Sequence, residues 1–481
     1  MNHSEDVAAI CRRQPPEMVC LMSVSEKIGR LRQRWRRAGT RTVAARGLVW
    51  LAAMTPFMAA AAETNGGPAG LRGALEARGV TFGGVYTGEV LANVMGGLRR
   101  GVLYQGKLET FVAVDFSKLT GWNGLSFYSN QFQIHGTGGI GRDFVGNINT
   151  ISNIEALPTT RLSELWLEQK FAGDKASIRF GQLTTDAEFF ISDFGNLFVT
   201  ADWPAITAVN LPSGGPAYPL STPGVRLKVQ ATDQLTILAA LFNGDPSGPG
   251  PEDAEIKNRY GLNFRVTDPP LAITELQYKY NQEGTAPAGT IKLGAWHHFG
   301  NFADHRFATD GLPLASPASS GIPRWLRGND GIYAVIDQQI YRPAGGGPDS
   351  GVAVFSRISG SPSDRNLIDF YLDGGIATAG LVPGRPDDKF GATFIYSRIS
   401  DAVRGFDRDL RFYSGSNLPI RDYELSFEFT YQAQIRPGWT VQPNIHYVIR
   451  PSGGVPDPHA ASPSVPIRNA LVLGLRSTSK F

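Results

Sequence analysis

One stretch near the carboxyl end of the chain, residues 422–434, constrains the fold more than any other. It reads D-Y-E-L-S-F-E-F-T-Y-Q-A-Q, so polar residues fill the even-numbered positions and apolar or aromatic residues fill the odd-numbered ones. A period of two indicates a β-strand with one polar and one apolar face. Strands of soluble proteins average about 5–6 residues, whereas about 9–11 residues cross a membrane at a steep tilt. We therefore predict a transmembrane β-barrel with its polar face toward water inside; the alternative is an edge strand of a large soluble sheet.

The first 62 residues have the composition of an export signal. A basic segment precedes an apolar run over residues 47–62, which ends in four alanines. These features define a secretory signal peptide, and the run is too short, and too interrupted by Pro56, to be a spanning helix. The basic segment is unusually long, so Met22 is an alternative start. We predict a signal peptide over residues 1–62, a segment with a short helix over 63–79 and the barrel over 80–481.

Removal of that segment changes the charge balance. It holds ten of the 46 Lys/Arg residues and four of the 43 acids, so the rest of the chain carries a slight negative charge and gives no support to nucleic-acid binding. Both cysteines, Cys11 and Cys20, also lie in it, which leaves no disulfide framework. No later stretch approaches 18 consecutive apolar residues, which excludes helical membrane spans.

Strand patterns alternate with turns up to the last residue. Examples of alternating stretches are residues 80–94, 107–116, 258–266, 274–281 and 470–481. The last of these ends in Phe481, and a terminal aromatic on an alternating strand is typical of outer-membrane proteins. Short connections alternate with long Gly/Pro/Ser-rich ones, as in a transmembrane barrel. Our strand count is 17. However, the alternation of short and long connections counted from the start of the chain disagrees with that counted from its end, and the mismatch falls between residues 271 and 362. Bacterial barrels have an even number of strands, so we predict an all-β antiparallel barrel of 16.

Several short motifs resemble the carbohydrate-selective porin family (OprB type), over most of the chain after residue 70. They read R-R-G (residues 99–101), Q-I-H-G (133–136), S-N-I-E-A (152–156), L-W-L-E-Q (165–169), N-L-P-S-G-G-P (210–216), F-N-G-D-P (242–246), P-S-D-R-N (362–366) and P-G-R-P-D-D (383–388). The resemblance implies a 16-stranded channel of the bacterial outer membrane for passive uptake of sugars such as glucose.

A sugar-selective pore needs hydrogen-bonding charges, aromatic surface and weak binding, because a tightly held solute cannot leave. Leu165, Leu167 and Phe171 predict the lipid face of one strand, which turns Glu164, Trp166 and Glu168 toward the lumen. Arg179, Arg226 and Lys228 lie on neighbouring inward faces, and we expect them to oppose the glutamates across a constriction. Arg100 and Glu109 are further candidates. The alternative is an ion pair that holds the wall together and, for Trp166, the cover of a folded-in loop.

The longest connection, residues 183–222, carries Asp186, Glu188, Asp193, Asp202 and Trp203. Loops of this length inside compact domains are usually functional. We predict that it folds into the barrel and narrows the channel; the alternative is a lid over the mouth.

Four other functions remain open: a small-solute channel without sugar selectivity, a soluble lectin-like protein, a structural or adhesive barrel closed to solutes, and an outer-membrane enzyme. Against an enzyme, the histidines are scattered and no G-x-S-x-G or H-E-x-x-H motif occurs. His297 and His298 point to opposite faces of a strand, so we predict no metal and no cofactor. The expected partners are small sugars and outer-membrane lipids, with the chain a monomer or a trimer.

Overall fold

The structure is a computed structural model that describes residues 70–200, 203–282, 286–347 and 350–481. The predicted signal peptide, with Met22 and both cysteines, lies outside the described residues, as does Asp202. In the described part, the α-helices are α4 (Leu71–Ala77), α5 (Phe116–Thr120), α6 (Ala205–Ala208), α7 (Ala254–Lys257) and α8 (Asp401–Ser414). Helix α4 confirms the short helix predicted at the start of the barrel. None of the described helices is both long and apolar enough to cross a bilayer.

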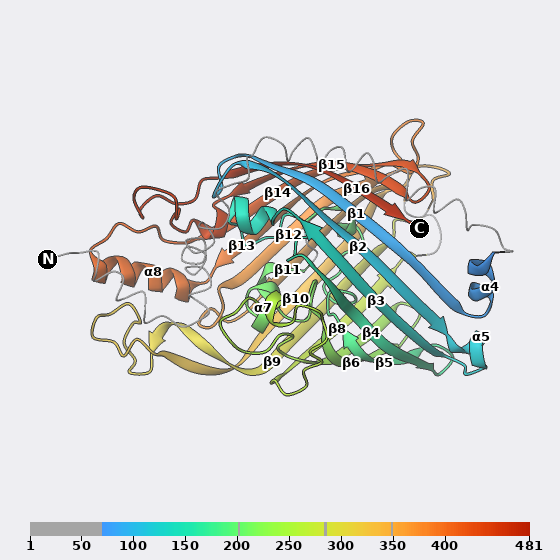
Figure 1. The fold of residues 1–481 in the computed structure, drawn as a ribbon, viewed down its shortest axis with the longest axis horizontal. Coiled ribbons are helices and arrows are strands. Elements are labelled where there is room, and N and C mark those ends of the chain that lie inside the picture. Colours follow the sequence, from blue (N-terminus) through green and yellow to red (C-terminus); the bar gives the residue numbers. More distant parts are fainter. Residues whose placement is uncertain (1–69, 201–202, 283–285, 348–349) are drawn as a thin grey trace.

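The strands form one closed antiparallel barrel in which β1 pairs with β16 and every other strand pairs with its neighbours in sequence (Figure 1). Closure leaves no unpaired sheet edge, as a membrane requires. The predicted number of 16 is confirmed, and their bounds are β1 Val80–Met95, β2 Gly101–Asp115, β3 Leu125–Gly136, β4 Thr159–Phe171, β5 Ala176–Leu183, β6 Thr222–Gln230, β7 Leu235–Asn243, β8 Pro270–Tyr280, β9 Gly289–Ala308, β10 Pro323–Tyr341, β11 Gly351–Gly360, β12 Ile368–Ala379, β13 Lys389–Ile399, β14 Tyr423–Arg436, β15 Trp439–Ile449 and β16 Ala470–Lys480.

One predicted strand, residues 258–266, is wrong, and because it lies before residue 271, the expected position of the miscounted strand between residues 271 and 362 is wrong as well. This segment lies within the long connection between β7 and β8. It nevertheless touches the barrel wall where β4 and β5 separate, because the Tyr260 carbonyl accepts from the Leu162 amide at 3.0 Å and the Gly261 carbonyl accepts from the Gln182 amide group at 3.0 Å. Tyr260 and Leu262 are both 59% exposed. The alternation thus marks a segment at the wall that lacks a full ladder.

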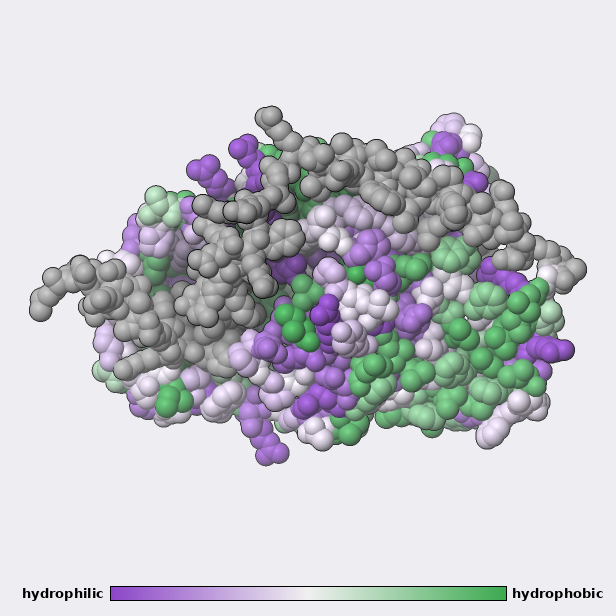
Figure 2. Space-filling model, viewed as in Figure 1, coloured by the Kyte–Doolittle hydropathy of each residue, from purple (hydrophilic) through white to green (hydrophobic). Residues whose placement is uncertain are grey.

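The two faces of the strands are inverted relative to a soluble protein. In β14 the polar residues Glu424 and Glu428 are buried, whereas Phe429 on the opposite face is 58% exposed. Apolar side chains gather on the outside of the molecule over β2 to β5, toward the end with the short turns (Figure 2). An apolar outer wall is the arrangement of a barrel surrounded by lipid. The long connections emerge at the opposite end, which is the extracellular end in such barrels.

Candidate functional site

The described part of residues 184–221, which we name the constriction loop, folds into the barrel as predicted. Carboxylates on three distant strands accept hydrogen bonds from its backbone. Glu275 of β8 accepts from the Phe190 amide at 3.0 Å, and Asp337 of β10 accepts from the Asp193 amide at 3.1 Å. Glu428 of β14 accepts from the Val199 and Thr200 amides at 2.8 and 3.0 Å. The loop therefore crosses from its root between β5 and β6 to the far wall.

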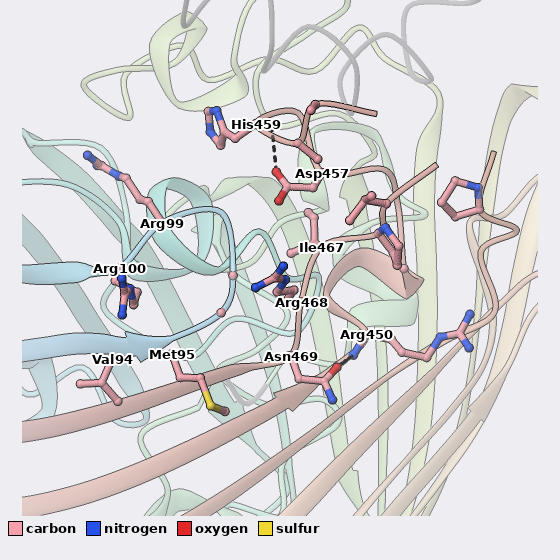
Figure 3. Close-up of a pocket in the computed structure, with 18 residues that line it drawn as sticks. Val94, Met95, Arg99, Arg100, Arg450, Asp457, His459, Ile467, Arg468 and Asn469 are labelled. Carbon is pink, nitrogen blue, oxygen red and sulfur yellow. Dashed lines mark hydrogen bonds between the residues drawn. The ribbon is translucent and has the colours of Figure 1, made fainter. Parts of the chain in front are cut away.

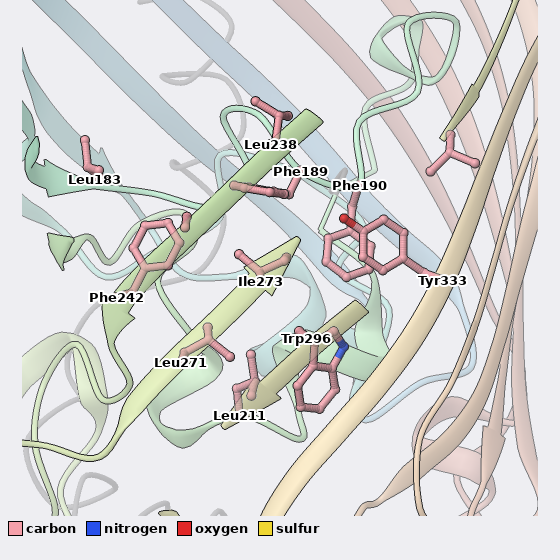
Figure 4. Packing of buried hydrophobic residues seen from close by; sticks show 12 residues of the cluster. Leu183, Phe189, Phe190, Leu211, Leu238, Phe242, Leu271, Ile273, Trp296 and Tyr333 are labelled. Atoms are coloured by element: carbon pink, nitrogen blue, oxygen red, sulfur yellow. The ribbon is translucent and has the colours of Figure 1, made fainter. Parts of the chain in front are cut away.

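An apolar core beneath the loop adds to these anchors (Figure 4). Phe189, Phe190 and Leu211 of the loop pack on inward side chains of β7 to β10, among them Leu238, Phe242, Leu271, Ile273, Trp296 and Tyr333. The Phe190 and Tyr333 rings are stacked with centroids 3.6 Å apart, and Trp203 meets Phe190 edge-on at 5.0 Å. Trp203, a predicted constriction residue, therefore lies in the core of the loop.

A second inward loop, residues 137–158, covers the neighbouring part of the wall. Glu424 of β14 accepts hydrogen bonds from the Ile148 and Asn149 amides at 2.8 and 2.7 Å. The hydroxyl of Ser152 donates to Glu89 of β1 at 2.7 Å. Glu424 and Glu428 are 0% and 1% exposed. Our expectation that the polar face of residues 422–434 lines water is thus wrong for these acids, which hold loop backbone instead.

Four predicted site residues form one ion-pair network at the root of the constriction loop. Arg226 pairs with Glu168 at 2.9 Å and with Glu188 at 2.5 Å. Arg179 pairs with the same two carboxylates, at 3.0 and 3.1 Å. The ladder places Glu168 opposite Arg179, and Arg179 opposite Arg226, on the adjacent strands β4, β5 and β6. The expectation that these arginines face Glu168 across the channel is therefore wrong: they lie beside it, and the network joins the loop to the wall.

This network predicts a large difference between two cations on the same inward face of β6. The Arg226 side chain is 2% exposed between two carboxylates, and removal of one member of a buried ion pair costs about 3–5 kcal/mol. Lys228, two residues on, is exposed and forms no ion pair with the described residues. We expect Arg226→Met to lower the unfolding free energy in urea by about 3 kcal/mol, and Lys228→Met to change it by less than about 0.5 kcal/mol. Equal effects of the two substitutions would contradict the assignment.

A second group of charged side chains, which we name the eyelet cluster, consists of Lys107, Glu109, Glu164 and Asp186. The Lys107 ammonium lies 3.5 Å from the Glu109 carboxylate, and their side chains are 15% and 25% exposed. The Asn130 side chain contacts both Glu164 and Glu109, and the Lys107 ammonium lies 5.0 Å from the centroid of the Tyr218 ring. Asp186 is fixed by the Tyr218 amide, which donates to it at 2.8 Å. Three acids and one lysine thus meet where the loop leaves the wall.

A β-bulge lies at Glu164 in this cluster. The pairing of β3 with β4 shifts so that Ser163 and Glu164 both lie opposite Asn130. The Asn130 side chain accepts a hydrogen bond from the Glu164 amide at 2.7 Å and donates to Glu109 at 2.9 Å. Bulges commonly re-aim a side chain next to a functional site. Asn130 therefore positions two acids of the cluster at once.

Trp166 stands in a row of inward side chains beside the eyelet cluster. Its indole is stacked on Tyr128 of β3 with centroids 5.1 Å apart, and the Arg179 guanidinium of β5 lies 3.8 Å from its centroid. Phe111 of β2 extends the row beyond Tyr128, at 6.1 Å. The two neighbours approach Trp166 from opposite sides, because β4 lies between β3 and β5. The row forms an aromatic wall, in which Trp166 is partly buried and packs against the apolar core of the constriction loop, as the alternative interpretation of this residue expected.

The remaining predicted residues lie apart from the eyelet cluster. Arg100 is exposed in the turn after β1, at the long-loop end. Lys228 lies toward the short-turn end of β6, and Asp193 is held against Asp337. Sequence reasoning missed Lys107, although it faces inward from the predicted strand over residues 107–116, two positions before Glu109. It also missed Asn130, since only the bulge makes that residue important. Among the described residues, no group of three or more His, Asp or Glu side chains could hold a metal ion.

Comparison with known proteins agrees with this architecture. The model of the family described as "Carbohydrate-selective porin, OprB family" matches residues 99–481. Porin B of Pseudomonas aeruginosa is 24% identical over 435 residues, which cover 86% of this chain and 90% of that protein. The high-pH structure of Pseudomonas putida OprB has 22% identity and a TM-score of 0.74, covering 86% of this chain and 96% of that one. The low-pH structure of the same protein has 17% identity and a TM-score of 0.50, covering 87% and 98%.

Proposed function

Because the chain belongs to the carbohydrate-selective porin, OprB family, we propose that its eyelet cluster selects neutral sugars as they diffuse through the barrel. The chain is an outer-membrane porin, and its closed sheet encloses one channel in each protein chain. The observation that supports the proposal is the convergence of Lys107, Glu109, Glu164 and Asp186 beside an aromatic wall, at the root of a loop that crosses the lumen.

The chemistry of the cluster suits a polyhydroxylated solute. Carboxylates accept hydrogen bonds from sugar hydroxyls, and the Lys107 ammonium donates to hydroxyl or ring oxygens. Hydrogen bonds to charged groups contribute about 1.5–3 kcal/mol each. A millimolar affinity corresponds to about 4 kcal/mol, so two or three such contacts suffice and still allow release. Ion pairs that already satisfy Glu168, Arg179, Glu188 and Arg226 leave these residues to hold the wall and the loop.

We assign no catalytic role, since the family is one of channels. The second candidate is a general small-solute channel, in which the loop merely limits solute size. Swelling of proteoliposomes distinguishes the two functions: a sugar-selective channel admits glucose faster than an uncharged polyol of equal size, whereas a size filter admits both at the same rate. Equal rates would reject the eyelet proposal and leave the general channel.

Trp166 provides a test of the aromatic wall. Its loss would remove the surface on which Arg179 and Tyr128 rest, and aromatic pairs contribute about 0.5–1.5 kcal/mol beyond their buried area. We expect Trp166→Ala to weaken the block of ion current by glucose about fivefold, and Trp166→Phe to keep most of it because a ring remains between its neighbours. An unchanged block in Trp166→Ala would remove this residue from the site.

A further inference from the structure

A groove lined by arginines lies at the outer rim of the barrel, between the turn after β1 and the connection from β15 to β16 (Figure 3). Its lining includes Arg99, Arg100, Arg450 and Arg468, with Val94 and Met95 at its base. Asp457 is the acidic residue in the described lining. We name this feature the rim groove. It is separate from the eyelet cluster, which lies on β2, β4 and the constriction loop.

The arginines of the rim groove differ in how many hydrogen bonds and ion pairs they already form within the protein. Arg99 donates to the Asp143 carbonyl at 2.9 Å and lies over the Phe144 ring. Arg450 lies 3.9 Å from Asp422, a loose pair. Arg100 and Arg468 are exposed and form no ion pair or side-chain hydrogen bond with the described residues. The groove therefore offers at least two guanidinium groups free to bind an anion.

Apolar surface lies directly beside this charge. Val94 and Met95, at the end of β1, are 41% and 44% exposed. Arg450 also lies 5.1 Å from the centroid of Tyr423, whose ring stacks on Tyr396. Aromatic girdles mark the level of the bilayer interface. The groove therefore lies at the boundary between the apolar wall and the solvent, with cations above and lipid-facing side chains below.

We propose that the rim groove binds a phosphorylated lipid head group of the outer leaflet. Guanidinium groups bind phosphate oxygens with strong, directional hydrogen bonds, so Arg100 and Arg468 would hold the phosphate while Arg450 assists from the girdle. Val94 and Met95 would contact the apolar part of the same lipid. A free anion gains nothing from contact with apolar side chains, whereas a lipid does. The structure therefore favours a lipid over a soluble phosphate. This inference does not depend on the sugar proposal.

The test compares lipid binding to the detergent-purified protein by native mass spectrometry. The probes are diphosphoryl lipid A, the same lipid without its phosphates, and inorganic phosphate. We expect Arg100→Gln/Arg468→Gln to weaken diphosphoryl lipid A binding about tenfold or more. Each basic residue near an anionic membrane surface adds to the free energy of binding, and this variant removes two of them. The matched control is Arg327→Gln/Arg408→Gln, which removes two exposed arginines elsewhere on the long-loop side; it should bind as the parent does.

Three outcomes would overturn the proposal: unchanged binding in Arg100→Gln/Arg468→Gln, equal binding of the lipid without phosphates, or inorganic phosphate binding as tightly as the lipid. The last would instead indicate a site for a soluble anion. Both double variants should keep the heat-modifiable migration of the folded parent barrel in gel electrophoresis, which shows that they are folded. If the first double variant fails to fold, Arg468→Gln alone should still weaken binding severalfold, and an unchanged value would reject the site.

Discussion

Loss of the carboxylates of Glu275 and Glu428 is expected to release the constriction loop and to raise the single-channel conductance. Glu428 accepts from the Val199 and Thr200 amides, and Glu275 accepts from the Phe190 amide and from the Tyr333 hydroxyl at 2.7 Å. Each hydrogen bond to a charged group contributes about 1.5–3 kcal/mol. Glu275→Ala/Glu428→Ala removes several at once and leaves loop amides unpaired, so the crossing segment should swing away from the wall and widen the channel.

Recordings of single channels in planar bilayers measure this effect. We expect the double variant to conduct more than Glu428→Ala alone, and Glu428→Gln to fall between Glu428→Ala and the parent because an amide oxygen still accepts one hydrogen bond. Block by glucose should weaken in the same order, since Asp186 belongs to the loop. A folded double variant with the conductance of the parent would show that the apolar core around Phe189 and Phe190 holds the loop by itself.

The second large effect is expected from Glu164, which faces inward at the bulge opposite Asn130. Glu164→Ala removes one hydrogen-bond acceptor and one charge from the eyelet cluster, and all four ion pairs of the network formed by Glu168, Arg179, Glu188 and Arg226 remain. The loss of one hydrogen bond to a charged group, about 1.5–3 kcal/mol, corresponds to roughly a tenfold or greater rise of the sugar concentration that blocks half of the current. Fewer acids at the constriction should also lower the ratio of cation to anion permeability.

Glu252→Ala is the matched control, because Glu252 is an exposed acid in the connection from β7 to β8. It should leave sugar block and ion preference unchanged. Asn130→Ala should act in the same direction as Glu164→Ala, but less strongly, since both carboxylates remain and only their positions are released. If sugars block the current through the Glu164→Ala channel as strongly as through the parent, they do not contact this carboxylate, and the eyelet proposal loses its central residue.

The sequence predicted the barrel wall well because the wall obeys a local rule. Lipid requires every second residue of each strand to be apolar, and Phe427, Phe429 and Leu473 follow that rule with no knowledge of their neighbours. The even number of strands likewise follows from a general property of bacterial barrels, and it corrected a count of 17. The inward direction of Glu109, Glu164, Trp166, Glu168, Arg179 and Arg226 follows from the same alternation.

What the interior residues contact could not be predicted, since those contacts join segments far apart in the chain. Glu428 and Glu164 both occupy polar positions of alternating strands. Glu428 nevertheless accepts hydrogen bonds from amides of a loop more than 200 residues earlier, whereas Glu164 belongs to the eyelet cluster. Likewise, only the register shows that Arg179 and Arg226 lie beside Glu168. Residues 258–266 alternate like a strand but do not pair as one. The alternation reflects a segment with one polar and one apolar side, and it does not determine which backbone hydrogen bonds form.

The most direct test of the central claim is the current through one open channel as sugar is added to the bath. If charged and aromatic side chains at a water-filled constriction recognise sugars, glucose and maltose will block at concentrations where an inert polyol of equal size leaves the current unchanged. If the polyol blocks equally well, the channel sorts solutes by size alone, and the eyelet cluster has no part in selection.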